Sequence, residues 1–233
     1  MLQKTSIQIR QIIIVIVFSS FVSGFAFFTE SGELIKDAHR QIVALSQTLY
    51  NGKQPDGQSL NALNIALSSL STTSINEYSD EIKNDKEFMR SHGVFDSLVR
   101  RFRELVSTNP GIDTLRCVFR DLKWSFLNIF TKYFLGEDAA PENTKILLFS
   151  TSVACKCILK MCDEQEQALY LIQSSYKVQP DLIVIDAFSN HDLKEKYDVM
   201  LLPTVIVLDK NNKELKRFVS EEKITQKVKT ALE

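Results

Sequence analysis

Three of the four cysteines in this chain of 233 residues lie close together, and they are the side chains best suited to chemistry. Cys155 and Cys157 are separated only by Lys156, and Cys162 follows five residues after Cys157. Closely spaced thiols can exchange disulfides or bind a soft metal ion, depending on their surroundings. The fourth cysteine, Cys117, has no motif around it, and we expect it to be a small apolar core residue.

The predicted start of a helix is what would make one of these thiols reactive. Residues 145–150 form an apolar run typical of a strand, and the spacing of apolar residues predicts a helix over residues 157–176. The unpaired backbone N–H groups at a helix amino terminus favour a thiolate, and Lys156 adds positive charge. We therefore expect Cys155 to be the nucleophile and Lys156 to stabilise its thiolate.

The other two clustered thiols have different expected roles. Cys157 is two residues from Cys155, so a disulfide between them would be strained and readily reduced. Cys162 lies on the same predicted helix, where it either resolves a mixed disulfide or is simply buried. The sequence leaves both interpretations of Cys162 open.

The carboxy-terminal third alternates strand and helix patterns in a restrictive order. Its expected elements are strands at 145–150, 182–185, 204–208 and 214–218, and helices at 157–176, 192–197 and 221–232. This order requires a parallel pair of strands followed by an antiparallel hairpin. The sequence thus predicts an α/β fold with a central mixed sheet and helices on both faces.

Two segments of this third resemble landmarks of the thioredoxin superfamily. The turn Ser152-Val-Ala-Cys-Lys-Cys157 joins a strand to a helix, where that family keeps its redox cysteines. The segment 192–209 carries Pro203-Thr204 directly before a strand, as the family's proline segment does. The resemblance implies that the peptide bond before Pro203 is cis and faces the cysteines, although cis bonds are only about 5–6% of X–Pro bonds.

The resemblance covers a core at residues 143–233. It extends over 111–233 if residues 115–119 form the family's first strand and residues 121–135 its first helix. This chain departs from the family in two ways. It has Cys-x-Cys in place of Cys-x-x-Cys, and Leu148 stands where many members have a buried acid.

The resemblance also implies an activity and a set of site residues. It implies exchange with thiols and disulfides of protein substrates, in which the Cys155 thiolate attacks and Cys157 or Cys162 resolves the mixed disulfide. It implies that the substrate binds against Leu202, Pro203 and Thr204, and it implies no bound cofactor. Whether the chain is an enzyme, as an oxidoreductase or an isomerase, stays open.

Two other functions stay open for the same residues. In one, the thioredoxin-like fold is catalytically degenerate and serves as a partner-binding scaffold. In the other, Cys155 and Cys157 bind Cu(I), as in a metallochaperone, because thiolates suit this soft cation. Replacing either cysteine would abolish copper binding, whereas a scaffold would tolerate both replacements.

Composition argues against two further classes of function. With 28 Lys+Arg against 29 Asp+Glu, the net charge is −1, so the chain has no basic field to hold nucleic acid. The three histidines, His39, His92 and His191, are far apart, and none has the spacing of a dedicated zinc site.

The amino terminus carries a membrane-targeting segment. Residues 12–28 are seventeen residues without a charge, a length between that of a spanning helix and that of a cleaved signal. We favour a retained single-pass anchor, with cleavage as the alternative. Basic residues precede the segment and acidic ones follow it, so the positive-inside rule places the amino terminus in the cytosol and the remainder outside it. The chain contains no Asn-x-Ser/Thr acceptor, which favours a bacterial envelope or periplasm over a secretory lumen.

We accordingly divide the chain into residues 1–29, 30–110 and 111–233. Apolar spacing of three and four predicts three helices in the middle region, the last of them interrupted near Gly93 and stopped at residues 109–111. The polar cluster at residues 68–79 is predicted to be a loop. The middle region is a spacer, a dimerisation element or a substrate platform, and the sequence does not fix the oligomeric state.

Overall fold

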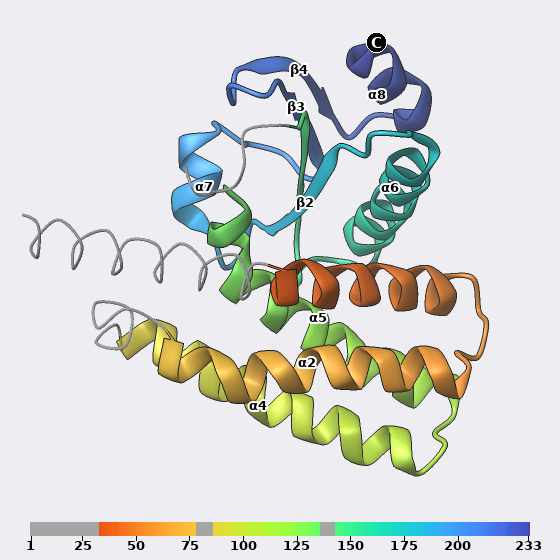
Figure 1. Ribbon diagram of the computed structural model, residues 1–233. Helices are drawn as coiled ribbons and strands as arrows, with labels where there is room; N and C mark the ends of the chain where they lie inside the picture. The colour runs from red at the N-terminus through yellow and green to blue at the C-terminus, as the bar shows by residue number, and fades with distance from the viewer. Residues whose placement is uncertain (1–32, 78–85, 136–142) are drawn as a thin grey trace, which may run out of the picture.

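The computed structural model describes residues 33–77, 86–135 and 143–233, and it is a mixed α/β fold (Figure 1). The first half is helical: a helix over residues 33–50, then α2 (Gly57–Glu77), α4 (Lys86–Ser107) and α5 (Ile112–Leu135). The second half contains β1 (Lys145–Ser150), α6 (Lys156–Ser175), β2 (Asp181–Asp186), α7 (His191–Lys196), β3 (Thr204–Leu208), β4 (Glu214–Val219) and α8 (Ile224–Leu232).

The helices predicted from apolar spacing are confirmed, but two of their predicted interruptions are wrong. α2 continues as helix through the serine-rich segment to Glu77. The Oγ of Ser68 donates to the carbonyl of Asn64 at 2.6 Å, and the Oγ of Ser69 donates to that of Ile65 at 3.1 Å, so these side chains bond to the helix itself. The hydroxyl groups of Ser68 and Ser69 therefore find acceptors without a break in the helix.

α4 likewise runs through Gly93 without a break. Buried His92, Phe95 and Val99 flank the glycine at helical spacing, so packing of this face outweighs the cost of one glycine, about 1 kcal/mol. The helix ends at Ser107, before the predicted stop at residues 109–111. The part of this helix predicted before residue 86 lies outside the described residues.

The prediction of a short strand at residues 115–119 is wrong, because α5 begins at Ile112 and includes this segment. Leu115, Val118, Phe119 and Leu122 are all buried, at the spacing of one helical face. Over five residues the alternation of Leu115, Cys117 and Phe119 cannot be told from helical spacing. Cys117 lies on the exposed side of this helix, so the expectation of a core position for it is also wrong.

The four strands form one mixed sheet in the order β2-β1-β3-β4. β1 and β2 are parallel, and β3 is antiparallel to both β1 and β4, which confirms the predicted parallel pair and hairpin. α6 and α8 lie on one face of the sheet and α7 on the other (Figure 1). Because side chains alternate along each strand, the sheet has two apolar faces that need these covers.

The core on the α6 and α8 face is continuous with the core of the helical half. Ile146 and Leu148 of β1 belong to the same cluster of buried residues as Leu63 of α2 and Phe126 of α5. The opposite face is a smaller cluster around Leu147 and Phe149 of β1, Ile185 of β2 and Leu193 of α7. The helical half is therefore packed onto the sheet through a shared core.

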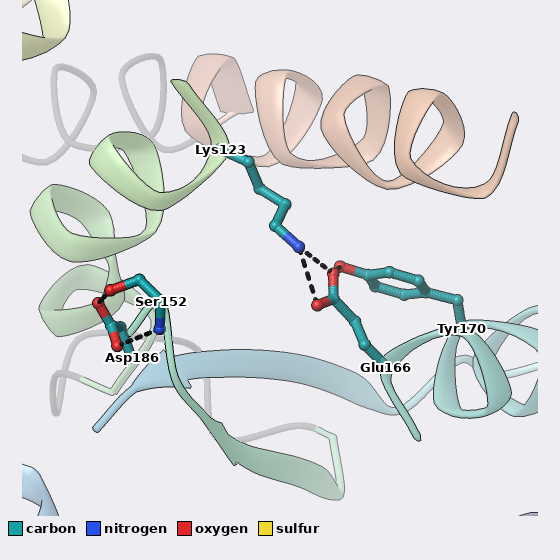
Figure 2. Close-up of polar contacts among 5 residues, drawn as sticks. All are labelled: Lys123, Ser152, Glu166, Tyr170 and Asp186. Atoms are coloured by element: carbon teal, nitrogen blue, oxygen red, sulfur yellow. Dashed lines mark hydrogen bonds and ion pairs between the residues drawn. The ribbon is translucent and has the colours of Figure 1, made fainter. Parts of the chain in front are cut away.

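A buried ion pair adds a polar contact between the two halves (Figure 2). The Nζ of Lys123 on α5 lies 2.9 Å from both carboxylate oxygens of Glu166 on α6. The hydroxyl of Tyr170 donates to the same carboxylate at 2.8 Å. Lys123 and Glu166 have side chains only 9% and 1% exposed, so this network is part of the core.

The strand directions bring four loops to one edge of the sheet, and three of them bear on the candidate site. β1, β2 and β4 end at this edge and β3 begins there, as their paired residues show. We call residues 151–155 the cysteine turn, residues 187–190 the Phe188 turn and residues 199–203 the proline loop. These three segments are the surroundings of the candidate site.

No helix among the described residues is both long and apolar enough to cross a membrane. The targeting segment predicted at residues 12–28 lies outside those residues.

Candidate active site

The cysteine turn ends at Cys155, directly before the first residue of helix α6. Cys155 is the N-cap residue, with an extended backbone (φ −64°, ψ 155°), and Cys157 is in the first turn of the helix. Both thiols are exposed, and all four cysteines are free. The predicted placement of Cys155 at a helix amino terminus is therefore confirmed.

The two exposed thiols differ in acidity because they share a hydrogen bond. The Cys157 thiol as a hydrogen-bond donor, and then the nearby backbone N–H of Ile158, lower the pKa of Cys155. The same interaction with Cys155, together with partial desolvation and the charge of the Cys155 thiolate, raises the pKa of Cys157. The Cys155 side chain is exposed, so its sulfur is accessible. Cys155 is thus the thiol that ionises first.

This difference predicts a pH-dependent preference in alkylation. Because the Cys155 pKa is lowered and the Cys157 pKa is raised, iodoacetamide at pH 7 should modify Cys155 faster than Cys157 in the same molecule. Only when the pH rises above the raised pKa of Cys157 are both groups thiolates, and the preference should then disappear. Peptide mapping after short pulses at several pH values measures both sites together. Equal rates at pH 7 would contradict the assigned acidities.

Cys162 is a core residue in this structure. It is 1% exposed on α6, and burial raises its pKa. To resolve a mixed disulfide on Cys155 it would have to bond to that sulfur, but Cys155 is seven residues before it, about 10 Å along the axis at the helix rise, whereas the Cα atoms of a disulfide lie within about 6.8 Å. Of the two interpretations left open for Cys162, the helix geometry favours the buried one, and Cys157 is the thiol placed to resolve a mixed disulfide.

The proline loop lies beside the cysteine turn. Phe149 pairs with Thr204 in the antiparallel β1 and β3 register, so Pro203 lies next to the end of β1, where the cysteine turn begins. The peptide bond between Leu202 and Pro203 is cis, as predicted. The carbonyl of Pro203 accepts a hydrogen bond from the backbone N–H of Ser220 at 2.8 Å. The register therefore brings the predicted substrate-binding residues to the edge that carries the cysteines.

Exposed apolar side chains surround this edge of the sheet. They are Val153 of the cysteine turn, Phe188 of the Phe188 turn, Met200 and Leu201 of the proline loop, and Val219 at the end of β4. Met200 is 81% exposed and Leu201 62% exposed. We call these five residues the apolar rim.

The sequence did not reveal one buried residue of the site, Asp186. It is the last residue of β2 and is 1% exposed, yet its carboxylate accepts four hydrogen bonds from the cysteine turn and the Phe188 turn. The only signal in the sequence is an acid directly after an apolar strand. That pattern alone does not say which donors the acid meets.

Among the described residues, no group of three or more His, Cys, Asp or Glu side chains is arranged to hold a metal ion. Comparison of the chain with protein-family models, with curated proteins and with solved structures found no significant match. The functional conclusion therefore depends on the geometry of the cysteine turn and its neighbours.

Proposed function

We propose that this chain is a thiol–disulfide exchange protein with a thioredoxin-like domain, and that Cys155 is its nucleophile. The observation that carries the proposal is the placement of Cys155. Its thiol is exposed at the N-cap of α6, within reach of the Cys157 thiol, and its pKa is lowered. An accessible thiol of lowered pKa at a helix amino terminus is the ordinary arrangement for exchange chemistry.

The reaction proceeds in two steps of thiol–disulfide exchange. The Cys155 thiolate attacks one sulfur of a substrate disulfide, the substrate S–S bond breaks, and the departing substrate sulfur takes a proton. The Cys157 thiolate then attacks the Cys155 sulfur, which releases the second substrate thiol and leaves a Cys155–Cys157 disulfide. The substrate gains two electrons and the protein loses two. The same steps in reverse oxidise a substrate dithiol.

The topology supports a thioredoxin-like domain for residues 143–233. The order of elements, the parallel pair β1 and β2 and the antiparallel pair β3 and β4 match the pattern expected from the sequence, and the cis bond before Pro203 matches what the resemblance implies. The second site segment, the proline loop, also lies beside the cysteine turn. These are separate features of the chain that agree on one site.

The apolar rim supports a polypeptide substrate with exposed apolar side chains. Val153 lies two residues before Cys155, and Phe188 and Met200 come from neighbouring loops at the same edge. Apolar surface gathered around a reactive group marks a binding site more often than a solvated one. Incompletely folded chains present both apolar side chains and unpaired cysteines, so they suit such a site. Residues 12–28, as the predicted anchor, would hold the domain at a membrane that faces an oxidising compartment.

The test is exchange between the reduced full chain and disulfide peptides. We expect one Cys155–Cys157 disulfide per chain, two released substrate thiols, and faster reaction with a peptide whose disulfide has apolar neighbours than with one that has charged neighbours. A rate no higher than that of free cysteine would overturn the proposal. Stoichiometric Cu(I) uptake without exchange would assign the same thiols to metal binding instead.

A further inference from the structure

The carboxylate of Asp186 accepts four hydrogen bonds from two turns outside the sheet. Its Oδ1 accepts from the backbone N–H of Ser152 at 3.0 Å and from that of Phe188 at 3.1 Å. Its Oδ2 accepts from the hydroxyl of Ser152 at 2.7 Å and from that of Ser189 at 3.0 Å. Each oxygen therefore takes one donor from the cysteine turn and one from the Phe188 turn (Figure 2 shows the Ser152 half).

This carboxylate holds together two turns that the strands alone leave separate. Asp186 pairs with Ser150 in the parallel register, so it lies where strands β1 and β2 both end. Beyond this pair, Ala187 donates its N–H to the carbonyl of Ser150 at 2.9 Å, and the sheet then ends. Hydrogen bonds to a buried carboxylate are stronger than neutral ones and leave its acceptors satisfied.

We propose that Asp186 is a positioning residue of the exchange site, which fixes the cysteine turn against the Phe188 turn and so holds Cys155 at the N-cap of α6. This inference rests on the proposed function of Cys155. Ser152 is three residues before Cys155, so its two hydrogen bonds to Asp186 limit where the turn can place the thiol. On the other side, the carboxylate sets Phe188 of the apolar rim beside the same turn.

The chain offers a matched pair of variants to test this role. Ser152→Ala and Ser189→Ala each remove one hydroxyl donor from the same oxygen of Asp186, but only the first lies in the cysteine turn. We expect Ser152→Ala to reduce the Cys155-over-Cys157 alkylation preference at pH 7 by about two- to fivefold, the size of a helix-terminus effect on a charge. We expect Ser189→Ala to leave this preference unchanged.

The Asp186→Asn variant separates position from charge. If the carboxylate acts by position, loosening of the turn should raise the apparent pKa of Cys155. If it acts only through its negative charge, the amide should lower that pKa, since a nearby anion disfavours a thiolate. Each variant is measured as the full reduced chain, by alkylation across pH, with thermal unfolding recorded beside it.

The outcomes distinguish this inference from the proposed function. A wild-type chain without preferential Cys155 alkylation would overturn the function itself. A normal wild type with a lowered pKa in Asp186→Asn, or with only its unfolding temperature changed, would overturn the positioning role. If Asp186→Asn does not fold, the Ser152→Ala and Ser189→Ala pair decides, and equal effects of the two would overturn the role.

Discussion

Replacing Cys155 with serine is expected to abolish exchange with disulfide peptides, by on the order of 10³-fold or more. A serine oxygen cannot form a disulfide and is almost fully protonated at neutral pH, whereas Cys155 has a sulfur whose pKa is lowered by its surroundings. The measurement is the rate of substrate thiol release by the reduced full chain.

The matched control for this variant is Cys117→Ser. Cys117 is also a free and exposed thiol, but it lies on α5, away from the cysteine turn. It should therefore retain the wild-type exchange rate. Equal losses in Cys155→Ser and Cys117→Ser would show that exposure alone accounts for the reactivity, and no loss in Cys155→Ser would contradict its role as the nucleophile.

Removing the buried cation of Lys123 is expected to give the largest loss of stability. In Lys123→Met, the carboxylate of Glu166 would stay buried without its partner at 2.9 Å, so the free energy of unfolding should fall by about 3–5 kcal/mol. His39 cannot replace the lost charge at neutral pH. The His39 ring is partly buried, and its desolvation lowers its pKa to about 4, although the negative charge of Glu166 acts to raise it.

Urea unfolding measures this loss, with Lys160→Met as the control, because Lys160 is on α6, the helix that carries Glu166. Lys160 is 77% exposed, and its Nζ lies 3.6 Å from Glu164, so its replacement should change the free energy of unfolding by less than about 1 kcal/mol. Replacing Lys123 and Glu166 together by methionine should recover much of the loss, since neither charge is then left alone. A loss in Lys123→Met no larger than that in Lys160→Met would contradict the buried pair.

The sequence predicted the sheet well because local patterns determine it. Short apolar runs such as residues 182–185 and 204–208 are strands in the structure, and the order of elements alone required a parallel pair and a hairpin. Its errors fell where local patterns are ambiguous. Residues 115–119 fit two periods, and the polar composition of residues 68–77 indicates a loop although they continue α2 as helix.

The candidate site was predictable only in part, for a similar reason. Residue type and spacing were enough to predict Cys155, Cys157 and Pro203 as site residues, and the strand register brings them to one edge of the sheet. Asp186 and the pair of Lys123 with Glu166 do not, because each meets its partner across 34 or 43 residues of chain. Such contacts follow from tertiary packing, which no short window of sequence contains.

The most direct test of the central claim is to trap the first covalent intermediate with Cys157→Ser. This variant keeps the Cys155 thiol but lacks the sulfur that would release the substrate. Mixed with a disulfide peptide and quenched in acid, it should carry one peptide thiol on Cys155, located by mass spectrometry and removed by reductant. No adduct, or an adduct found equally on Cys117, would contradict the assignment of Cys155 as the nucleophile.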